Sequence, residues 1–147
     1  MRTIFEGTPI LDGKYRLLQL LGAGGGGHVY KCRHLGLKRL VAVKVLRPQF
    51  AAQPQHMARF RREAEILGHL RHPHIVEVTD FGVDAERKIP YLVMEYLEGE
   101  TLSERIRNHG PLELADALVI FEQIASGIDH VHAAGVLHRD LRRPTCS

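Results

Sequence analysis

A run of glycines places the strongest constraint on the fold of this chain. Residues 22–29 read GAGGGGHV and lie between two segments typical of strands, residues 15–21 and 29–33. Glycine permits positive φ and lets backbone N–H groups approach an anion closely. A dinucleotide-binding loop has similar glycine spacing, but it must open into a helix, and the apolar residues after Gly27 predict a strand instead. The segment therefore predicts a hairpin able to hold phosphate, with a merely flexible hairpin as the alternative.

Hydrophobic periodicity extends this pattern along the chain. Three further strands are predicted at residues 40–46, 75–81 and 90–96, and helices at residues 55–70, 101–108 and 113–133. In the strand 40–46, Val41, Val43 and Val45 lie on one face and Lys44 lies on the other. Five strands with one helix thus precede a helical part, with a hinge expected near residues 98–100. This is an α+β chain, which we divide into a lead-in at 1–14, a first part at 15–97 and a second part at 98–147.

Composition excludes several other classes of protein. The net charge of +3 over 147 residues is too small to indicate nucleic-acid binding. No apolar stretch is long enough to cross a membrane, and the first residues lack the features of a signal peptide, so we expect a cytoplasmic location. Cys32 and Cys146 form no disulfide framework. The histidines of residues 69–74 lack the second ligand pair typical of a zinc site.

A lysine and a glutamate stand out because of where their side chains are expected to point. The strand segment VAVK ends at Lys44, next to Ala42 on the same face. In the following helix, Glu63 shares the apolar face of Phe60 and Leu67, because these residues recur at spacings of three and four. A carboxylate on an apolar face is costly unless it is paired, so we predict an ion pair between Glu63 and Lys44. Taken separately, each residue has a simpler interpretation. Lys44 would be a lysine exposed on its strand, and Glu63 would be a glutamate that reaches water.

A fourth motif follows the long second-part helix. Residues 136–141 read VLHRDL, and a carboxylate in such a loop, here Asp140, can accept the proton of a substrate hydroxyl. Taken alone, the same aspartate would be interpreted as a residue that caps a turn.

The four motifs, in this order and spacing, give the chain its resemblance to protein kinases, in particular the bacterial serine/threonine kinases. The resemblance runs from about residue 15 to residue 141 and includes FRREA at 60–64, HPHIV at 72–76 and PYLVMEY at 90–96. It implies a kinase-like fold, with a five-stranded antiparallel small lobe and the first helices of a helical large lobe. It also implies ATP-dependent phosphorylation of protein hydroxyls, with magnesium in the intact family.

The resemblance also implies the roles of individual residues. Lys44, paired with Glu63, would hold the α and β phosphates, Asp140 would be the catalytic base, and Arg139 would hold the activation loop. Met94 would be the gatekeeper, and Glu95 and Leu97 would bind adenine through their backbones. The full set expected around the nucleotide is Leu21, Gly22, Ala23, Gly24, Gly25, Gly26, Gly27, His28, Val29, Ala42, Lys44, Met94, Glu95 and Leu97.

The sequence also departs from the family pattern. Residues 80–82 read DFG, but they precede the HRD segment, whereas the functional DFG follows it, so we interpret Asp80 as structural. After Asp140 the family has a lysine and an asparagine where this chain has Arg142 and Thr145, and no later DFG follows. Both magnesium ligands are therefore missing, no metal residue is assigned, and we expect little or no kinase activity from these 147 residues alone.

Three other interpretations of the sequence compete with this one. A non-catalytic module that binds nucleotide or a partner kinase is the main alternative, and weak nucleotide binding by the small lobe is expected in either case. A dinucleotide-dependent oxidoreductase is disfavoured because no βαβ pattern appears. Tyrosine specificity is not excluded by the residues present.

The long helix is also expected to keep apolar residues exposed. Its apolar side chains point around the helix rather than along one face, namely Leu118, Phe121, Ile124, Ile128 and Val131. Such a surface favours self-association.

Overall fold

A computed structural model describes residues 10–24 and 26–135, and these form two compact units. The first unit contains the residues up to His69 together with Glu77–Leu97. The second contains Leu70–Val76 together with the residues from Glu98 onward. The segment Leu70–Val76, which lies inside the first part by position in the sequence, is thus grouped with the helices.

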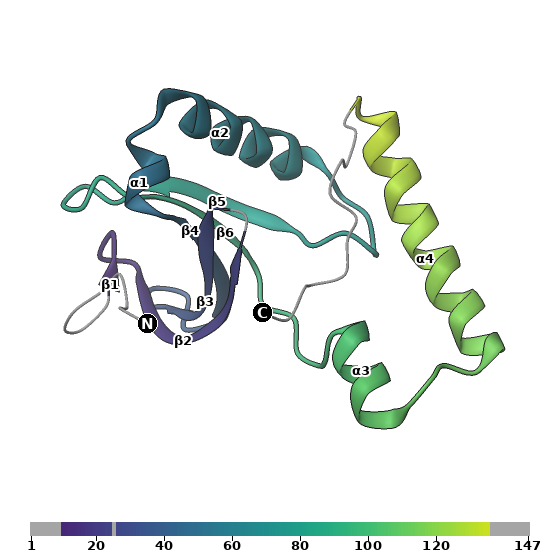
Figure 1. Ribbon diagram of the computed structural model, residues 1–147. Coiled ribbons are helices and arrows are strands. Elements are labelled where there is room, and N and C mark those ends of the chain that lie inside the picture. The colour runs from purple at the N-terminus through teal and green to yellow at the C-terminus, as the bar shows by residue number, and fades with distance from the viewer. Residues whose placement is uncertain (1–9, 25, 136–147) are drawn as a thin grey trace. The chain divides into compact units, whose positions relative to one another are not determined.

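The first unit is built on an antiparallel sheet with the strand order β1-β2-β3-β4-β6-β5 (Figure 1). The strands are β1 (Ile10–Leu11), β2 (Tyr15–Gly24), β3 (Gly27–His34), β4 (Leu40–Leu46), β5 (Val78–Val83) and β6 (Pro90–Glu95). The sheet has one strand more than the five predicted. The additional strand is β1, which pairs with Arg16 and Tyr15 of β2. Its two residues are too few to show an alternating pattern in the sequence. The predicted antiparallel arrangement is confirmed.

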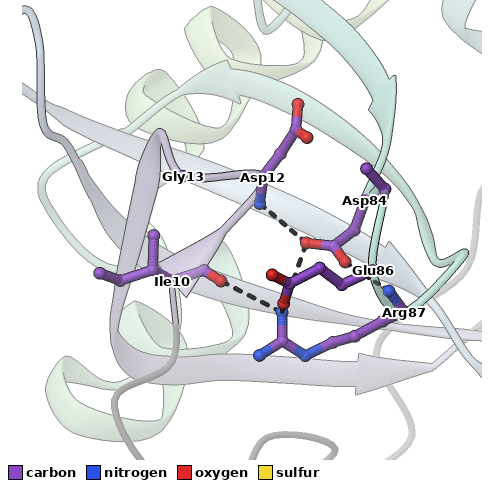
Figure 2. Close-up of a pocket in the computed structure, with 7 residues that line it drawn as sticks. Ile10, Asp12, Gly13, Asp84, Glu86 and Arg87 are labelled. Atoms are coloured by element: carbon purple, nitrogen blue, oxygen red, sulfur yellow. Dashed lines mark hydrogen bonds and ion pairs between the residues drawn. The ribbon is translucent and has the colours of Figure 1, made fainter.

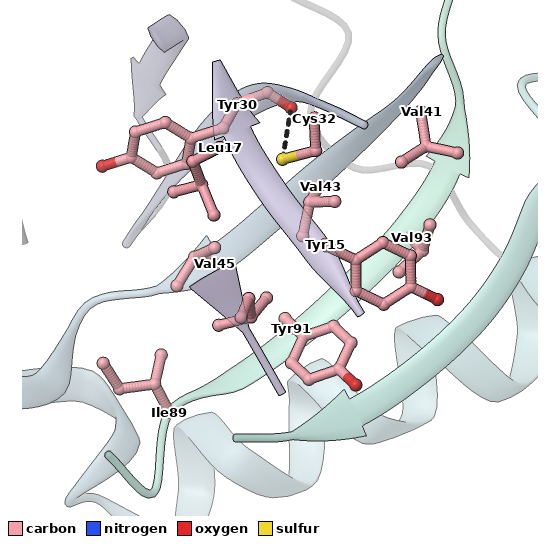
Figure 3. Close-up of a cluster of buried hydrophobic side chains, with 11 residues drawn as sticks. Tyr15, Leu17, Tyr30, Cys32, Val41, Val43, Val45, Ile89, Tyr91 and Val93 are labelled. Carbon is pink, nitrogen blue, oxygen red and sulfur yellow. Dashed lines mark hydrogen bonds between the residues drawn. The ribbon is translucent and has the colours of Figure 1, made fainter. Parts of the chain in front are cut away.

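Alternation along β4 separates the two faces of the sheet, as predicted. Val41, Val43 and Val45 are buried in a cluster that includes the rings of Tyr15 and Tyr91 (Figure 3). On the other face Leu46 packs with Phe60 of helix α2 (Pro54–His69). The helix predicted at 55–70 is therefore confirmed to within one residue at each end. Its apolar residues cover the face of the sheet on which Lys44 lies.

A short helix that was not predicted, α1 (Pro48–Ala51), connects β4 to α2. It has proline at its first position, where the missing N–H costs no intrahelical hydrogen bond. Four residues give no periodicity to detect, which is why the sequence pattern did not reveal it.

The second unit contains helices α3 (Leu102–His109) and α4 (Leu114–Ala133). Thr101 caps α3 by accepting a hydrogen bond from the Glu104 amide, and the Glu104 carboxylate accepts one from the Thr101 amide in return. The segment Leu70–Val76 packs on α4, where His72 Nε2 lies 3.0 Å from Ser126 Oγ. At Gly127 a Cβ would approach the carbonyl oxygen of His74 to 3.2 Å, so glycine allows this close contact.

Helix α4 keeps a large part of its apolar surface exposed. Phe121 is 63% exposed, and Leu118 and Ile124 are also exposed, whereas Val131 is buried. The expectation that α4 leaves some apolar residues in water is thus met. No helix among the described residues is long and apolar enough to span a membrane.

Candidate functional site

The strand register places the expected site residues of the first unit in one row across the sheet. Val29 on β3 lies opposite Gly22 on β2 and opposite Lys44 on β4, and Lys44 in turn lies opposite Leu92 on β6. Residues directly opposed in antiparallel strands share a face. Lys44 and Val29 therefore project from the same side of the sheet, beside the strand ends that carry the glycine-rich loop.

Lys44 meets Glu63 on this face. The Lys44 ammonium donates a hydrogen bond to Glu63 Oε1 at an Nζ–Oε1 distance of 2.8 Å, and it lies 5.6 Å from the centre of the Phe60 ring. The side chains are 24% and 43% exposed, so water screens the pair and its contribution to stability is at most about 1 kcal/mol. The effect of the pair is thus mainly to orient an ammonium group on an otherwise apolar surface. Glu63 both pairs with Lys44 and reaches water, so the two interpretations of this residue both hold in part.

The glycines of the glycine-rich loop differ in the space available for a side chain. At Gly22 and Gly24 an added Cβ would meet no atom within 4 Å. At Gly27 a Cβ would lie 2.7 Å from the Val45 carbonyl oxygen, so a larger residue would displace the strand. Gly26 has φ of +85°, which favours glycine. The open backbone at Gly22 and Gly24, beside a lysine, fits the phosphates of a nucleotide. Gly25 lies outside the described residues.

His28 does not share the face of Lys44. It pairs in register with Val45, and its side chain is buried beside Tyr30 on the other side of the sheet. Burial and the nearby Arg47 charge lower the pKa of His28. Any contact between His28 and a phosphate would therefore use its backbone. Strand alternation predicts this orientation, because Tyr30 and Cys32 on the same face are buried.

The residues expected around an adenine ring lie on neighbouring strands. Ala42 is buried on β4 and pairs in register with Met94 of β6. The Glu95 amide donates a hydrogen bond to the Glu77 carbonyl oxygen at 2.9 Å, so this amide is already paired within the first unit. Leu97 and Leu21 are exposed. Asp140, Arg139, Arg142 and Thr145 lie outside the described residues, so their roles stay predictions.

The DFG sequence at residues 80–82 has structural contacts within β5. Asp80 Oδ2 accepts a hydrogen bond from the Tyr15 hydroxyl at 2.7 Å, and its Oδ1 accepts one from the Phe81 amide. The Phe81 ring lies 5.9 Å from that of Phe60, and Gly82 leaves room for the Tyr91 hydroxyl. Each of the three residues thus supports the fold of the first unit. These contacts agree with the interpretation of Asp80 as structural.

A pocket elsewhere in the first unit contains none of the expected site residues (Figure 2). It lies between the β1–β2 turn and the turn that follows β5. Asp84 is almost fully buried there and accepts hydrogen bonds from the Asp12 and Arg87 amides at 2.8 and 2.7 Å. Burial acts to raise the pKa of Asp84, but these amides and the Arg87 charge outweigh it and lower the pKa. The sequence analysis missed this network, although the residues after Val83 have the composition of a turn.

No metal site is formed by the part of the chain that the structure describes. Within residues 10–24 and 26–135 no group of three or more His, Cys, Asp or Glu side chains is placed to hold a metal ion.

Comparison with known proteins decides the family. Residues 15–144 match the family model of the protein kinase domain. This chain belongs to the protein kinase family. It is 44% identical over 132 residues to the serine/threonine-protein kinase PrkC of Bacillus subtilis, and 41% identical over 135 residues to PknA of Mycobacterium tuberculosis. Family membership implies ATP and magnesium in general.

The matched relatives are longer than this chain. The match covers 90% of this chain in both comparisons, but 20% of PrkC and 31% of PknA. The crystal structure of the Mycobacterium tuberculosis PknI kinase domain is similar with a TM-score of 0.75 and 32% identity, over 93% of this chain and 55% of that one. The chain therefore has the kinase-like fold that its motifs predicted, and it spans a part of the length of these relatives.

Proposed function

We propose that this chain is part of a serine/threonine protein kinase that transfers the γ-phosphoryl group of ATP to protein hydroxyls. In this proposal residues 15–97 are the small lobe and residues 98–147 begin the large lobe. The observation that carries it is the Lys44–Glu63 pair, because an oriented ammonium beside open glycine backbone is suited to the phosphates of ATP. The location proposed for this reaction is the cytoplasm.

Different residues would bind different parts of ATP. The backbone of residues 22–27 would donate N–H groups to phosphate oxygens, and Lys44 would neutralise the α and β phosphates while Glu63 holds it in place. Val29 and Ala42 would contact the adenine ring from one side, next to Met94. Glu95 and Leu97 would recognise its edge through their backbones. Asp140 would accept the proton of the substrate hydroxyl.

The ability to transfer the phosphoryl group has other requirements than the ability to bind ATP. Phosphoryl transfer needs metal ions to neutralise the charge on the phosphates, and the family places their ligands at and beyond the segment where this chain has Arg142 and Thr145. We therefore propose that the 147 residues bind ATP in a manner that depends on Lys44 more than on magnesium. Their transfer activity alone would be small.

The test measures transfer of labelled γ-phosphate from ATP to a serine- and threonine-containing protein. It compares the 147 residues alone with the same chain after addition of a large-lobe fragment from a bacterial relative. Transfer that appears on addition and is lost in Lys44→Met supports the kinase proposal. ATP binding without transfer in either condition supports a non-catalytic module instead. Rapid turnover by the 147 residues alone would contradict the expected need for the added part.

A further inference from the structure

We propose that Phe50 is a positioning residue for nucleotide binding. Its ring supports Gly26 at the tip of the glycine-rich loop and joins this loop to the first turn of α2, the helix that carries Glu63. The inference deepens the proposed function, because it concerns the residues that shape the same site. Phe50 itself belongs to none of the motifs found in the sequence.

The Phe50 ring contacts the glycine-rich loop at Gly26. A Cβ at Gly26 would lie 3.3 Å from Cδ2 and 3.5 Å from Cε2 of Phe50, so the ring covers the side of Gly26 on which a side chain would stand. The Gly26 carbonyl oxygen also accepts a hydrogen bond from the Arg47 amide at 2.9 Å. The connection between β4 and α2 therefore holds the loop by one backbone hydrogen bond and one aromatic ring.

The Phe50 ring also contacts helix α2. The Phe50 and His56 rings meet edge-on, with centroids 4.9 Å apart and an interplanar angle of 69°. His56 lies in the first turn of α2, and Glu63 follows about two helical turns later. Phe50 also packs against the apolar cluster that contains Phe60. One side chain thus contacts both the loop and the helix whose position sets the Lys44–Glu63 pair.

The local backbone explains why Phe50 points in this direction. Arg47 is extended and Pro48 begins α1, so the direction of the short helix is set as the chain leaves β4. Figure 1 shows α1 between the end of β4 and the start of α2. Removal of the ring would take away this support, while the hydrogen bond from the Arg47 amide to the Gly26 carbonyl oxygen would stay. Since Gly26 has φ of +85° and no side chain, its backbone would then sample more conformations.

The test compares Phe50→Ala with Met57→Ala in the full 147-residue chain. Met57 packs against the same apolar cluster, whereas the three atoms nearest to the Cβ position of Gly26 all belong to Phe50, so the Met57 variant controls for a general loss of packing. Hydrogen exchange is measured for the amides of residues 24–29 and 54–63, and ATP affinity is measured by calorimetry. We expect Phe50→Ala to speed exchange in both segments and to weaken ATP binding by about threefold to tenfold. Phe50→Tyr, which keeps the ring, should restore both properties.

The outcomes separate this inference from the proposed function. Equal changes in Phe50→Ala and Met57→Ala, or unchanged exchange at residues 24–29 in Phe50→Ala, would overturn the positioning role. If Phe50→Ala does not fold, Phe50→Leu provides the same comparison, because it keeps apolar volume without a flat ring. A wild-type chain that binds no ATP would count against the proposed function, while the exchange measurement would still decide whether Phe50 supports the loop.

Discussion

The Lys44 ammonium and the Glu63 carboxylate, nineteen residues apart in the sequence, meet at 2.8 Å and connect strand β4 to helix α2. Neither side chain is buried, and the pair lies at the edge of an apolar layer formed by Phe60, Leu92 and Leu46. An ion pair in this setting stabilises the fold only weakly. The main effect of the pair is to orient Lys44, because Glu63 holds its ammonium group beside Val29 and the strand ends of the glycine-rich loop.

Asp80 is predicted to matter for stability and not for nucleotide binding. Asp80→Ala leaves the buried Tyr15 hydroxyl without its 2.7 Å hydrogen bond, which should lower the free energy of unfolding by about 1–3 kcal/mol. Tyr15→Phe removes the same hydrogen bond from the other side and should cost less, because it leaves a more accessible group unpaired. Chemical denaturation gives the stabilities and calorimetry the ATP affinities. Loss of magnesium-dependent ATP binding in a folded Asp80→Ala chain would show that the structural interpretation is wrong.

Asp84 should make the first unit sensitive to acid. The pKa of this carboxyl is lowered in the folded state, so the unfolded chain takes up a proton at a higher pH than the folded chain does. Its stabilising contribution is therefore present above the ordinary aspartate pKa of about 4 and is lost as the pH falls through the lowered folded value. Asp84→Asn should flatten this part of the dependence of unfolding free energy on pH.

The matched control for Asp84 is Glu86→Gln, a carboxylate in the same turn whose side chain is 86% exposed. It should leave the acid sensitivity unchanged. Equal pH profiles for the wild type and Asp84→Asn between pH 2 and pH 5 would contradict the role given to Asp84.

Much of the fold and of the candidate site could be predicted because the relevant residues follow simple periods. Alternation along residues 40–46 separates Val43 from Lys44, and helical spacing places Glu63 beside Phe60. These two patterns together predict the Lys44–Glu63 pair from the sequence alone. The same alternation, applied to β3, places the His28 side chain on the opposite face, away from any phosphate near Lys44.

The features that were missed depend on contacts between segments that carry no pattern. The strand β1 has two residues, and α1 has four, which is too few for either period. The contact of Phe50 with Gly26 joins residues of unrelated local structure. The grouping of Leu70–Val76 with α4 depends on a close approach at Gly127, which the sequence shows only as an isolated glycine within a helix.

His72 is predicted to make the packing of Leu70–Val76 on α4 dependent on pH. Its Nδ1 accepts a hydrogen bond from the His74 amide, and its Nε2 lies 3.0 Å from Ser126 Oγ. Partial loss of water, together with the nearby His130 and His74, lowers the pKa of His72. The unfolded chain therefore binds more protons as the pH falls below about 6.5, and stability is lost from there down to the lowered folded pKa.

Two measurements check the role of His72. NMR titration should give His72 a pKa below that of an unperturbed histidine. Local opening of residues 126–131, measured as the amide exchange rate relative to the intrinsic rate at each pH, should rise between pH 7 and pH 5. His72→Gln should remove most of that rise, because glutamine does not titrate in this range. An unchanged rise in the variant would assign the effect to other groups.

The exposed apolar residues of α4 predict self-association of the isolated chain. Leu118 and Phe121 together present a hydrophobic surface, and contact with a second copy would remove it from water. Sedimentation at increasing protein concentration should show a rising average mass, which the double variant Leu118→Ser and Phe121→Ser should reduce. Gln123→Ser, an exposed change on the same helix, is the control. A chain that stays monomeric at high concentration would contradict this prediction.

The most direct test of the central claim is the ATP affinity of the purified chain, measured by calorimetry with and without magnesium. The variants are Lys44→Met, Glu63→Gln and, as a control on the same helix, the exposed Glu65→Gln. We predict that the wild type and Glu65→Gln bind ATP equally, that Glu63→Gln binds more weakly, and that Lys44→Met binds at least about tenfold more weakly. Each variant should stay within about 1 kcal/mol of wild-type stability. A folded wild-type chain that binds no ATP, or equal affinity in Lys44→Met, would contradict the assignment of this site to nucleotide.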